Sequence, residues 1–444
     1  MKIIVAGDGE TGTHMARTLS VEGQDVVLMG TDREHLAELD ASGNFITFEG
    51  SPMSRSNLLQ CGADGADMFV AVTPDETVNL ISCQLAKDCG ALKCVARIDN
   101  PDFDSDSNRS LFLRMGIDMT IYPEKLAAVE ILHFIRHNWV SDWIELHQGA
   151  LIIAGVKMQP DGALCGKSLN EVPNNPRLFH VSAIRRGTSV IIPRGDDKLL
   201  EGDTIYFSVL PGNCDILPEL CGKKVRRTKK IMISGAGRVT ENLLELISGQ
   251  YDVTVIDPDK DRCGVIASRF PDVVTVNSRV NDIITLEEEG IDQCDMFLAL
   301  TGSSEKNIVS CMVAREHRVG KTVARIEELQ YMPEAENLAI DKIINKKLLN
   351  SGKILSVLLD CNMATAQCIS LGTAEITEII ATADSKIVSA PVAELSLPRD
   401  ITVGGIIRDR TGILAEGRTR IMPGDHVVVF YMPGSLPKLS RFFR

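Results

Sequence analysis

An internal duplication constrains the fold of this chain more than any other feature of the sequence. Gly7 and Gly9 in IVAGDGETG recur as Gly235 and Gly237 in IMISGAGRVT, at an offset of 228 residues (235 − 7). The same offset relates further pairs: Asp67 and Asp295, Thr73 and Thr301, Asn79 and Asn307, Arg97 and Arg325. Later in each copy the offset becomes 222 (424 − 202), pairing Gly202-Asp203 with Gly424-Asp425 and Arg186 with Arg408. We therefore expect two tandem copies, each with a larger first part and a smaller second part.

The larger first parts, here called N-lobes, alternate between short apolar runs and amphipathic stretches. The runs KIIVA, DVVLM, FITF, MFVAV, CVARI and MTIY are typical of buried strands, and helical periodicity covers 13–22, 33–42, 54–61 and 76–89. The pattern repeats from Lys230 to about Ile344. This alternation predicts an α/β fold with tandem Rossmann-like, doubly wound parallel sheets that carry helices on both faces.

The smaller second parts, here called C-lobes, are rich in glycine and β-branched residues over 146–210 and 371–432, which predicts small α+β lobes. The helical stretches 123–139 and 345–359 are expected to join the lobes and to offer an apolar face to another subunit. The basic run KKVRRTKK is expected to be a solvated linker. The predicted domains are 1–122 (first N-lobe), 123–145 (crossover helix), 146–222 (first C-lobe), 223–229 (linker), 230–344 (second N-lobe), 345–365 (crossover helix) and 366–444 (second C-lobe).

Composition narrows the class of protein. The 444 residues carry 47 basic and 60 acidic side chains, a net charge of −13 that argues against a nucleic-acid-binding surface. No uninterrupted apolar run reaches the ~18 residues of a membrane span, so we expect no direct membrane insertion. The start, MKIIVAGDGE, lacks the basic region of a signal peptide. The twelve cysteines are scattered and are expected to be reduced, which favours a cytoplasmic protein.

The motif Gly7-x-Gly9-x-x-Gly12 follows a predicted strand and precedes a predicted helix, which is the context of a dinucleotide-binding fingerprint. The first glycine permits a tight turn, and the second lets the backbone approach a pyrophosphate at the helix N-terminus. The third allows close packing of helix on strand. In the second copy Thr240 replaces this third glycine. The alternative is that the glycines serve only the turn.

An acidic residue is expected at the end of the second strand, where it accepts hydrogen bonds from the adenosine ribose. Asp257 has this position in the second copy, whereas the first copy has Gly30 and the nearest acid is Asp32. Loss of such a charge-assisted bond costs about 1.5–3 kcal/mol, or roughly ten- to hundredfold in affinity. We therefore predict two unequal sites.

Residues at the ends of the fourth and fifth strands complete the candidate sites. Thr73-Pro74 and Thr301-Gly302 follow the fourth strand of each copy, at the edge where doubly wound folds bind ligands. Arg97 and Arg325 end the fifth strand, either to form a surface salt bridge or to pair with phosphate.

Patterns for metal binding and catalysis are incomplete. Asp257, Asp259 and Asp261 resemble the start of an EF-hand, but Arg262 stands where glycine is required. His133 and His137 are four residues apart on a predicted helix without a third ligand. We therefore predict no metal site and no catalytic residues.

The chain resembles the TrkA family of Trk-system potassium uptake proteins, and its halves look like tandem RCK (regulator of potassium conductance) domains. The resemblance rests on GDGETG, ADMFVAVTPDETVN and VARID, on their second-half counterparts and on GDHVVVF near the end. It implies NAD(H), and possibly ATP or ADP, as cofactor, and C-lobes that pair between subunits. The implied binding residues are Gly7, Asp8, Gly9, Glu10, Thr11, Gly12, Asp32, Thr73, Pro74 and Arg97, and in the second half Gly235, Ala236, Gly237, Arg238, Val239, Asp257, Thr301, Gly302 and Arg325.

Three functions compete at this point. The resemblance implies a non-enzymatic gating subunit, homo-oligomeric as a dimer or tetrameric ring, peripheral to the inner face of the plasma membrane through a TrkH-like potassium transporter subunit. An NAD-dependent oxidoreductase is the alternative, although the C-lobes offer no obvious proton-donor set. A scaffold with vestigial sites is the third, and the intact glycine turn and Asp257 count against it.

Overall fold

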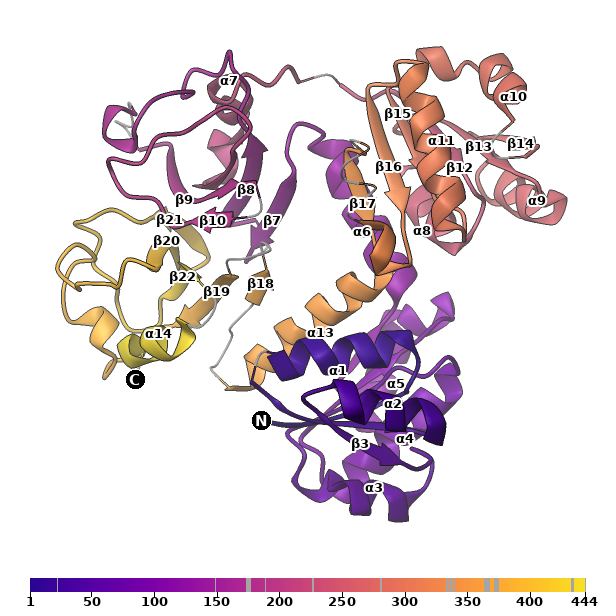
Figure 1. Ribbon diagram of the computed structural model, residues 1–444, viewed down its shortest axis with the longest axis horizontal. Coiled ribbons are helices and arrows are strands. Elements are labelled where there is room, and N and C mark those ends of the chain that lie inside the picture. Colours follow the sequence, from indigo (N-terminus) through magenta and orange to yellow (C-terminus); the bar gives the residue numbers. More distant parts are fainter. Residues whose placement is uncertain are drawn as a thin grey trace.

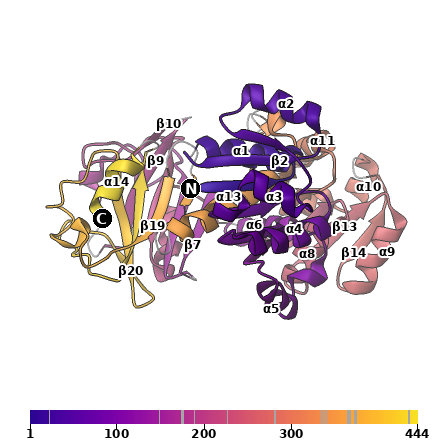
Figure 2. The same ribbon diagram turned by 90° about the horizontal axis from the view of Figure 1, so that it is seen from below.

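The computed structural model describes residues 1–444 except 22, 148, 173–176, 188, 226, 280–281, 333–334, 336–337, 339, 363–367, 371–374, 433–434 and 444. Residue 226 of the predicted linker and the predicted boundary at 365/366 lie outside the described residues. Figure 1 shows three masses: the first N-lobe, the second N-lobe, and the two C-lobes together. In the view from below, the C-lobe sheets lie at one side and both N-lobes at the other (Figure 2).

The first N-lobe is a parallel six-stranded sheet of order β3-β2-β1-β4-β5-β6, as predicted. Alternate residues of β1 point to opposite faces, because side chains alternate along a strand: Ile3 and Val5 pack in one apolar cluster, and Ile4 and Ala6 in another. The elements are β1 (Lys2–Ala6), α1 (Glu10–Val21), β2 (Asp25–Gly30), α2 (Arg33–Ser42), β3 (Ile46–Glu49), α3 (Arg55–Cys61), β4 (Met68–Ala71), α4 (Glu76–Cys89), β5 (Lys93–Arg97), α5 (Asp106–Arg114) and β6 (Met119–Ile121).

The second N-lobe repeats this topology with the order β14-β13-β12-β15-β16-β17, again all parallel. The elements are β12 (Lys230–Ser234), α8 (Arg238–Ile247), β13 (Asp252–Asp257), α9 (Lys260–Arg269), β14 (Val274–Asn277), α10 (Ile283–Glu288), β15 (Met296–Ala299), α11 (Ser304–Glu316), β16 (Lys321–Arg325) and β17 (Lys342–Ile344). Each sheet thus reverses its strand order beside its first strand, the place where doubly wound folds bind ligands.

Each C-lobe is an antiparallel five-stranded sheet, of order β10-β9-β11-β8-β7 in the first copy and β18-β19-β22-β20-β21 in the second. One bidentate ion pair is repeated: Arg186 binds Asp203 at 2.8 and 2.9 Å, and Arg408 binds Asp425 at 2.7 Å twice. The elements are β7 (Asp142–Leu146), β8 (Leu151–Lys157), β9 (Phe179–Arg186), β10 (Ser189–Ile191), β11 (Thr204–Val209), α7 (Leu217–Leu220), β18 (Cys368–Ser370), β19 (Glu375–Ile380), β20 (Ile401–Arg408), β21 (Thr411–Leu414), β22 (His426–Tyr431) and α14 (Leu436–Phe443).

The crossover helices correct one expectation, because each packs on the N-lobe of the opposite half. The apolar face of α6 (Pro123–Arg136), with Ile131 and Phe134, is buried in the core of the second N-lobe against α8. The other helix, α13 (Lys346–Asn362), packs against α1 and inserts Ile354 into the first N-lobe core. The prediction that these faces serve another subunit is therefore wrong for the described residues. Amphipathicity requires that a face be covered, but it does not identify the covering surface.

The two C-lobes pair with each other within the chain, where the resemblance had implied pairing between subunits. Their sheets share one apolar cluster, in which Leu151 and Tyr206 of the first lobe meet Val428 and Phe430 of the second. Glycine permits the close approach, since a Cβ at Gly412 would lie 2.1 Å from the Ala150 carbonyl oxygen. Because the duplication places both copies in one chain, one C-lobe can cover the exposed apolar face of the other.

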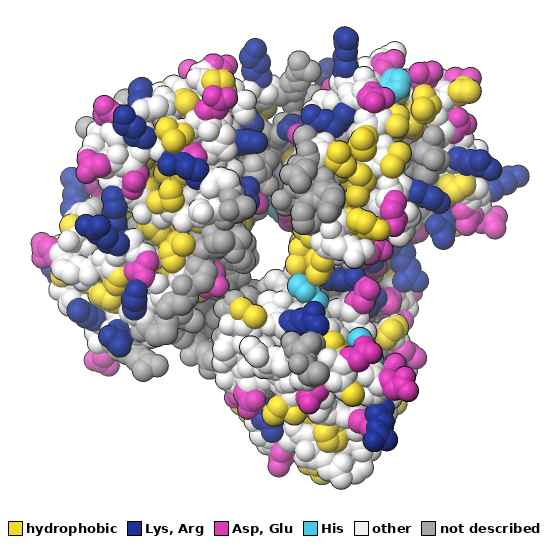
Figure 3. All heavy atoms as spheres, viewed as in Figure 1, with side chains coloured by type: hydrophobic (Ala, Val, Ile, Leu, Met, Phe, Trp, Pro, Cys, Tyr) yellow, Lys and Arg dark blue, Asp and Glu magenta, His cyan; other side chains and the backbone are white. Residues whose placement is uncertain are grey.

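Two features concern contact with a membrane: the distribution of charged side chains on the surface, and the length and polarity of the helices. Acidic and basic side chains are interspersed over the face shown in Figure 3. In the part of the chain that the structure describes, every helix is too short or too polar to cross a bilayer.

Candidate nucleotide-binding sites

In each N-lobe the first strand of the parallel sheet is followed by a turn at a glycine. This turn lies close to the backbone at the end of the neighbouring strand. Gly7 has φ +127° and Gly235 has φ +109°, and a Cβ at either residue would lie 3.0 Å from a backbone nitrogen, that of Thr73 or Thr301. The amide of Gly7 donates to the Met29 carbonyl at 2.9 Å. A side chain at the first glycine is excluded by both conformation and space.

The second glycine of each motif faces open space. A Cβ built on Gly9 or on Gly237 meets nothing within 4 Å, and helices α1 and α8 begin at the next residues, Glu10 and Arg238. The free amide groups of a helix N-terminus, beside a position without a side chain, form a seat for a phosphate. The residues present therefore fit a nucleotide.

The residue at the third position of the glycine motif differs between the two halves. A Cβ at Gly12 would lie 1.7 Å from the Gly7 carbonyl oxygen, so the first half requires glycine there. In the second half the buried Thr240 hydroxyl donates to the Gly235 carbonyl at 2.5 Å. The missing third glycine is thus replaced by a hydrogen bond, and α8 is still held to the turn.

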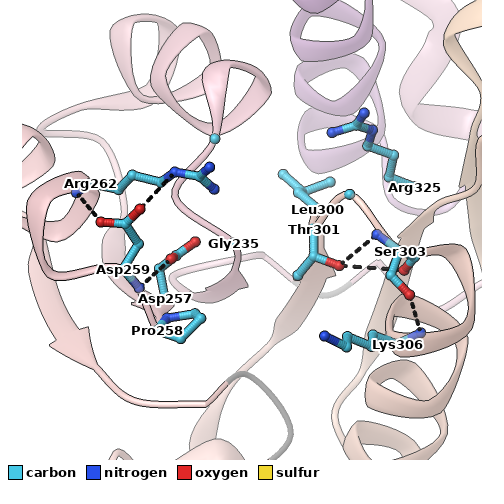
Figure 4. A pocket seen from close by; sticks show the side chains of 12 residues that line it. Gly235, Asp257, Pro258, Asp259, Arg262, Leu300, Thr301, Ser303, Lys306 and Arg325 are labelled. Carbon is cyan, nitrogen blue, oxygen red and sulfur yellow. Dashed lines mark hydrogen bonds and ion pairs between the residues drawn. The ribbon is translucent and has the colours of Figure 1, made fainter.

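In the second half these elements surround a cavity of about 650 Å³. Asp257 and Asp259 lie on one side of it, and Thr301, Ser303 and Lys306 lie on the other (Figure 4). Asp257 is 4% exposed; its carboxylate accepts hydrogen bonds from the amides of Ala236 at 2.7 Å and Asp259 at 2.8 Å. The carboxylate is therefore held at the end of β13, where a ribose would be recognised.

In the first half the corresponding carboxylate belongs to Asp8. Asp8 Oδ2 accepts the amides of Thr31 and Asp32, each at 2.9 Å, and a Cβ at Gly30 would lie 2.2 Å from this oxygen. The Asp32 side chain instead caps α2 by accepting the His35 amide at 3.0 Å. An acidic group thus lies at the end of β2, although it belongs to Asp8 of the preceding loop and not to a residue of β2 itself.

In both halves a buried asparagine connects the residue that follows the fourth strand to the end of the fifth strand. This role was not predicted from the sequence. Asn79 Oδ1 accepts from the Thr73 amide at 2.8 Å and hydroxyl at 2.7 Å, and its amide donates to the Arg97 carbonyl at 3.0 Å. Asn307 makes the same bonds to Thr301 and to the Arg325 carbonyl. The two asparagines recur at the constant offset of 228 residues, and this recurrence was the signal from which the role could have been predicted.

The paired arginines have carboxylate partners. Arg97 binds Asp99 at 3.0 Å, and Arg325 binds Glu327 at 2.5 Å while also lining the second-half cavity. Sequence reasoning missed two further cations of that cavity, Arg262 and Lys306. A cavity edged by fixed carboxylates and by cations matches the ribose and phosphate parts of a nucleotide.

The remaining predicted residues divide between the site, the core and the opposite half. Val239 and Ala236 are buried, Thr11 is half-buried, and Pro74 is exposed. Gly302 lines the cavity. Glu10 and Arg238 are related by the 228-residue offset, and each contacts the other half of the chain: Glu10 pairs with Lys347 of α13, and Arg238 Nη1 donates to the Asp99 carbonyl at 3.1 Å. Both phosphate seats are thus connected to the opposite half.

Comparison with known proteins agrees with this architecture. The TrkA-N domain model matches residues 3–123 and 231–346, and the TrkA-C domain model matches residues 153–217 and 376–444. The chain belongs to the TrkA family. It is 28% identical to Trk system potassium uptake protein TrkA homolog 1 of Methanosarcina mazei over 453 residues, covering 100% of both chains. It is also 28% identical to Trk system potassium uptake protein TrkA of Halomonas elongata over 436 residues, covering 97% of this chain and 95% of that one.

Two solved structures share the fold. The crystal structure of the GsuK RCK domain matches with a TM-score of 0.63 and 15% identity, covering 100% of this chain and 94% of that chain. The GsuK channel bound to NAD also matches with a TM-score of 0.63, at 14% identity, covering 100% of this chain and 78% of that one. The chain thus has the fold of two tandem RCK domains, each formed by a TrkA-N and a TrkA-C domain.

Proposed function

We propose that this chain is a cytoplasmic, non-enzymatic regulatory subunit of a Trk-type potassium uptake system. It binds NAD(H) or an adenine nucleotide in its N-lobes and acts on a TrkH-like membrane transporter subunit, as part of a homo-oligomer. The names of the Methanosarcina and Halomonas relatives support the transport role, and the NAD-bound RCK neighbour supports the class of ligand.

The observation that carries the proposal is the connection of each phosphate seat to the other half. The residue that follows Gly9, Glu10, pairs with a lysine of the second half, and the residue that follows Gly237, Arg238, bonds to the first half. A phosphate arriving at either helix N-terminus adds negative charge beside these contacts. Binding would therefore favour one arrangement of the halves over another, and a ligand shifts such a balance only by its differential affinity for the two states.

The nucleotide would be held by the same set of groups in both halves. The helix N-termini at Glu10 and Arg238 would receive phosphate, and the carboxylates of Asp8 and Asp257 would receive the ribose hydroxyls. In the second half, Arg262, Lys306 and Arg325 line the cavity and would neutralise phosphate charge.

The test is a calorimetric binding panel of NADH, NAD⁺, ATP and ADP on the full chain and on Gly9→Asp and Gly237→Asp variants. Both glycines face open space, so an aspartate there should leave the fold intact while repelling phosphate. Gly65→Asp is the matched control, since a Cβ at Gly65 also meets nothing within 4 Å and this residue lies outside both sites.

Each seat variant should remove one class of binding while the control retains both. Absence of saturable binding by the unmodified chain would contradict the proposal. Nucleotide binding that survives in the double variant would place the sites elsewhere. Substrate-dependent oxidation of NADH would favour the oxidoreductase alternative.

A further inference from the structure

Two histidines and a glutamate converge where the two C-lobes meet, far from both nucleotide sites. His147 lies in the turn between β7 and β8 of the first C-lobe, and Glu378 and His426 lie on the paired strands β19 and β22 of the second. His147 Nε2 is 2.7 Å from Glu378 Oε1 and 3.0 Å from His426 Nδ1, and the last two atoms are 2.6 Å apart. Three ligand-type atoms therefore form one small triangle.

With the Glu378 carboxylate ionised, protons alone cannot make all three of these contacts favourable. If both ring nitrogens carry a proton, both can donate to the carboxylate, but the two N–H groups then oppose each other across 3.0 Å. If His147 alone carries the proton, the lone pair of His426 Nδ1 faces the carboxylate oxygen at 2.6 Å. If His426 alone carries the proton, the lone pair of His147 Nε2 faces the same carboxylate oxygen at 2.7 Å. A cation at the centre of the triangle would satisfy all three atoms.

Burial of the carboxylate provides a second, independent observation. Glu378 is 2% exposed, and its other oxygen, Oε2, has no hydrogen-bond partner among the described residues. An unpaired polar atom at such depth is costly, because a buried charge must be paired or must bind a metal. His147 adds a further sign of constraint, since its backbone has φ +47° in the left-handed region, which is uncommon outside glycine.

We propose that His147, Glu378 and His426 form a Zn²⁺ site that links the two C-lobes of the chain. Two imidazole nitrogens and a carboxylate are ligands that suit Zn²⁺, whereas Ca²⁺ and Mg²⁺ prefer oxygen. Zinc bonds of about 2.0–2.2 Å at tetrahedral angles separate ligand atoms by about 3.3 Å, so the edges of the triangle need to lengthen by about 0.3 to 0.7 Å, which small side-chain rotations supply. Glu378 Oε2 or a water completes the coordination.

The position of the site gives zinc a defined effect. One ligand comes from the first half of the chain and two come from the second, so the metal is bound only when the C-lobes are paired. Its binding free energy adds to that pairing, because a ligand that binds one state stabilises that state. Sequence reasoning could not find the site, since His147 is 231 residues from Glu378 and 279 from His426.

The experiment measures Zn²⁺ binding to the full chain after removal of metal with a chelator, by competition with a chromophoric zinc indicator. The variants are His147→Asn, which tolerates the left-handed backbone, and Glu378→Gln, which keeps the side-chain shape. His35→Asn, on α2 of the first N-lobe, is the control. We expect one Zn²⁺ per chain, and affinity at least about a hundredfold weaker in both site variants, since loss of even a second-shell partner costs 10–100-fold.

Two further readouts separate this site from other sources of zinc binding. Zinc should raise the melting temperature of the unmodified chain and of the control, but not of the site variants. Cobalt bound in place of zinc should lack the intense thiolate charge-transfer band, which excludes the cysteines. No stoichiometric zinc, unchanged affinity in His147→Asn, or a thiolate band would each overturn the proposal.

Discussion

The carboxylate of Asp8 occupies the space beside the α-carbon of Gly30, where a Cβ would come within 2.2 Å of Asp8 Oδ2. In the second half the acidic residue and the small residue have exchanged positions. Asp257 stands at the strand end equivalent to Gly30, and Ala236 stands at the loop position of Asp8 and donates its amide to Asp257 at 2.7 Å. The acidic group is thus present at both sites, although different elements supply it.

We predict that Asp8→Ala weakens nucleotide binding by the first half roughly ten- to hundredfold, the cost of losing a charge-assisted hydrogen bond of about 1.5–3 kcal/mol. Gly30→Asp combined with Asp8→Gly should restore most of this affinity, because glycine at residue 8 also removes the Cβ that would lie 2.4 Å from a Cβ at residue 30, and residue 30 has no left-handed φ. Calorimetry in a Gly237→Asp background isolates this site. Asp64→Ala, on the exposed surface, is the control. A fully active Asp8→Ala variant would assign the ribose to another group.

Local sequence patterns were sufficient for the two parallel sheets and for the glycine turns. Strands such as β1 are apolar on both faces, and the turn requires glycine at residues 7 and 235 for steric reasons that act within a few residues. Repetition at a constant offset then related the two halves.

Relationships between distant residues could not be predicted in the same way. The pattern of α6 showed an apolar face, but its burial against α8 depends on how the halves dock. The replacement of a strand-end acid by Asp8 depends on a side chain crossing from one loop to the next strand. Sequence periodicity contains no information on either contact.

A buried ion pair joins the first turns of the two crossover helices, and we predict that it couples the halves. Glu124 is 7% exposed and accepts from Lys346 Nζ at 2.9 Å. Lys346→Met should destabilise the N-lobes by about 3–5 kcal/mol, because it leaves a buried carboxylate uncompensated. Adding Glu124→Gln should recover part of that loss. Denaturant unfolding of the two single variants and the double variant measures the interaction.

Lys87→Met is the matched control for this ion pair. Lys87 pairs with Asp118 at 3.0 Å, with both side chains about one-third exposed. A pair in such a position contributes less than about 1 kcal/mol. Equal losses in Lys87→Met and Lys346→Met would contradict the assignment of a special role to the buried pair.

His180 on β9 should make stability sensitive to acid. Burial lowers its pKa to about 4, with the nearby Arg177 acting in the same direction, and its Nε2 has no hydrogen-bond partner among the described residues. The unfolded chain binds this proton near pH 6.5, so stability is complete above that pH and is lost as the pH falls toward 4. The loss is at most roughly 3 kcal/mol.

His180→Phe removes this titration while keeping a ring in the same place. The free energy of unfolding of the unmodified chain should therefore fall more steeply between pH 6.5 and pH 4 than that of the variant. Measuring chemical denaturation at several pH values tests the difference. Parallel curves for the two proteins would show that His180 does not contribute to acid sensitivity.

Gly412 on β21 should be the most sensitive glycine of the C-lobe pair. A Cβ there would lie 2.1 Å from the backbone oxygen of Ala150, in the other C-lobe, so alanine forces the two sheets apart. We expect Gly412→Ala to destabilise the C-lobes by about 1–3 kcal/mol, the usual cost of overpacking, and to expose the shared apolar cluster to a hydrophobic dye. Gly212→Ala is the control, since its Cβ meets nothing within 4 Å. If the two variants melt alike, the close approach of the C-lobes does not limit stability. If Gly412→Ala alone is destabilised, pairing of the C-lobes within the chain contributes to stability.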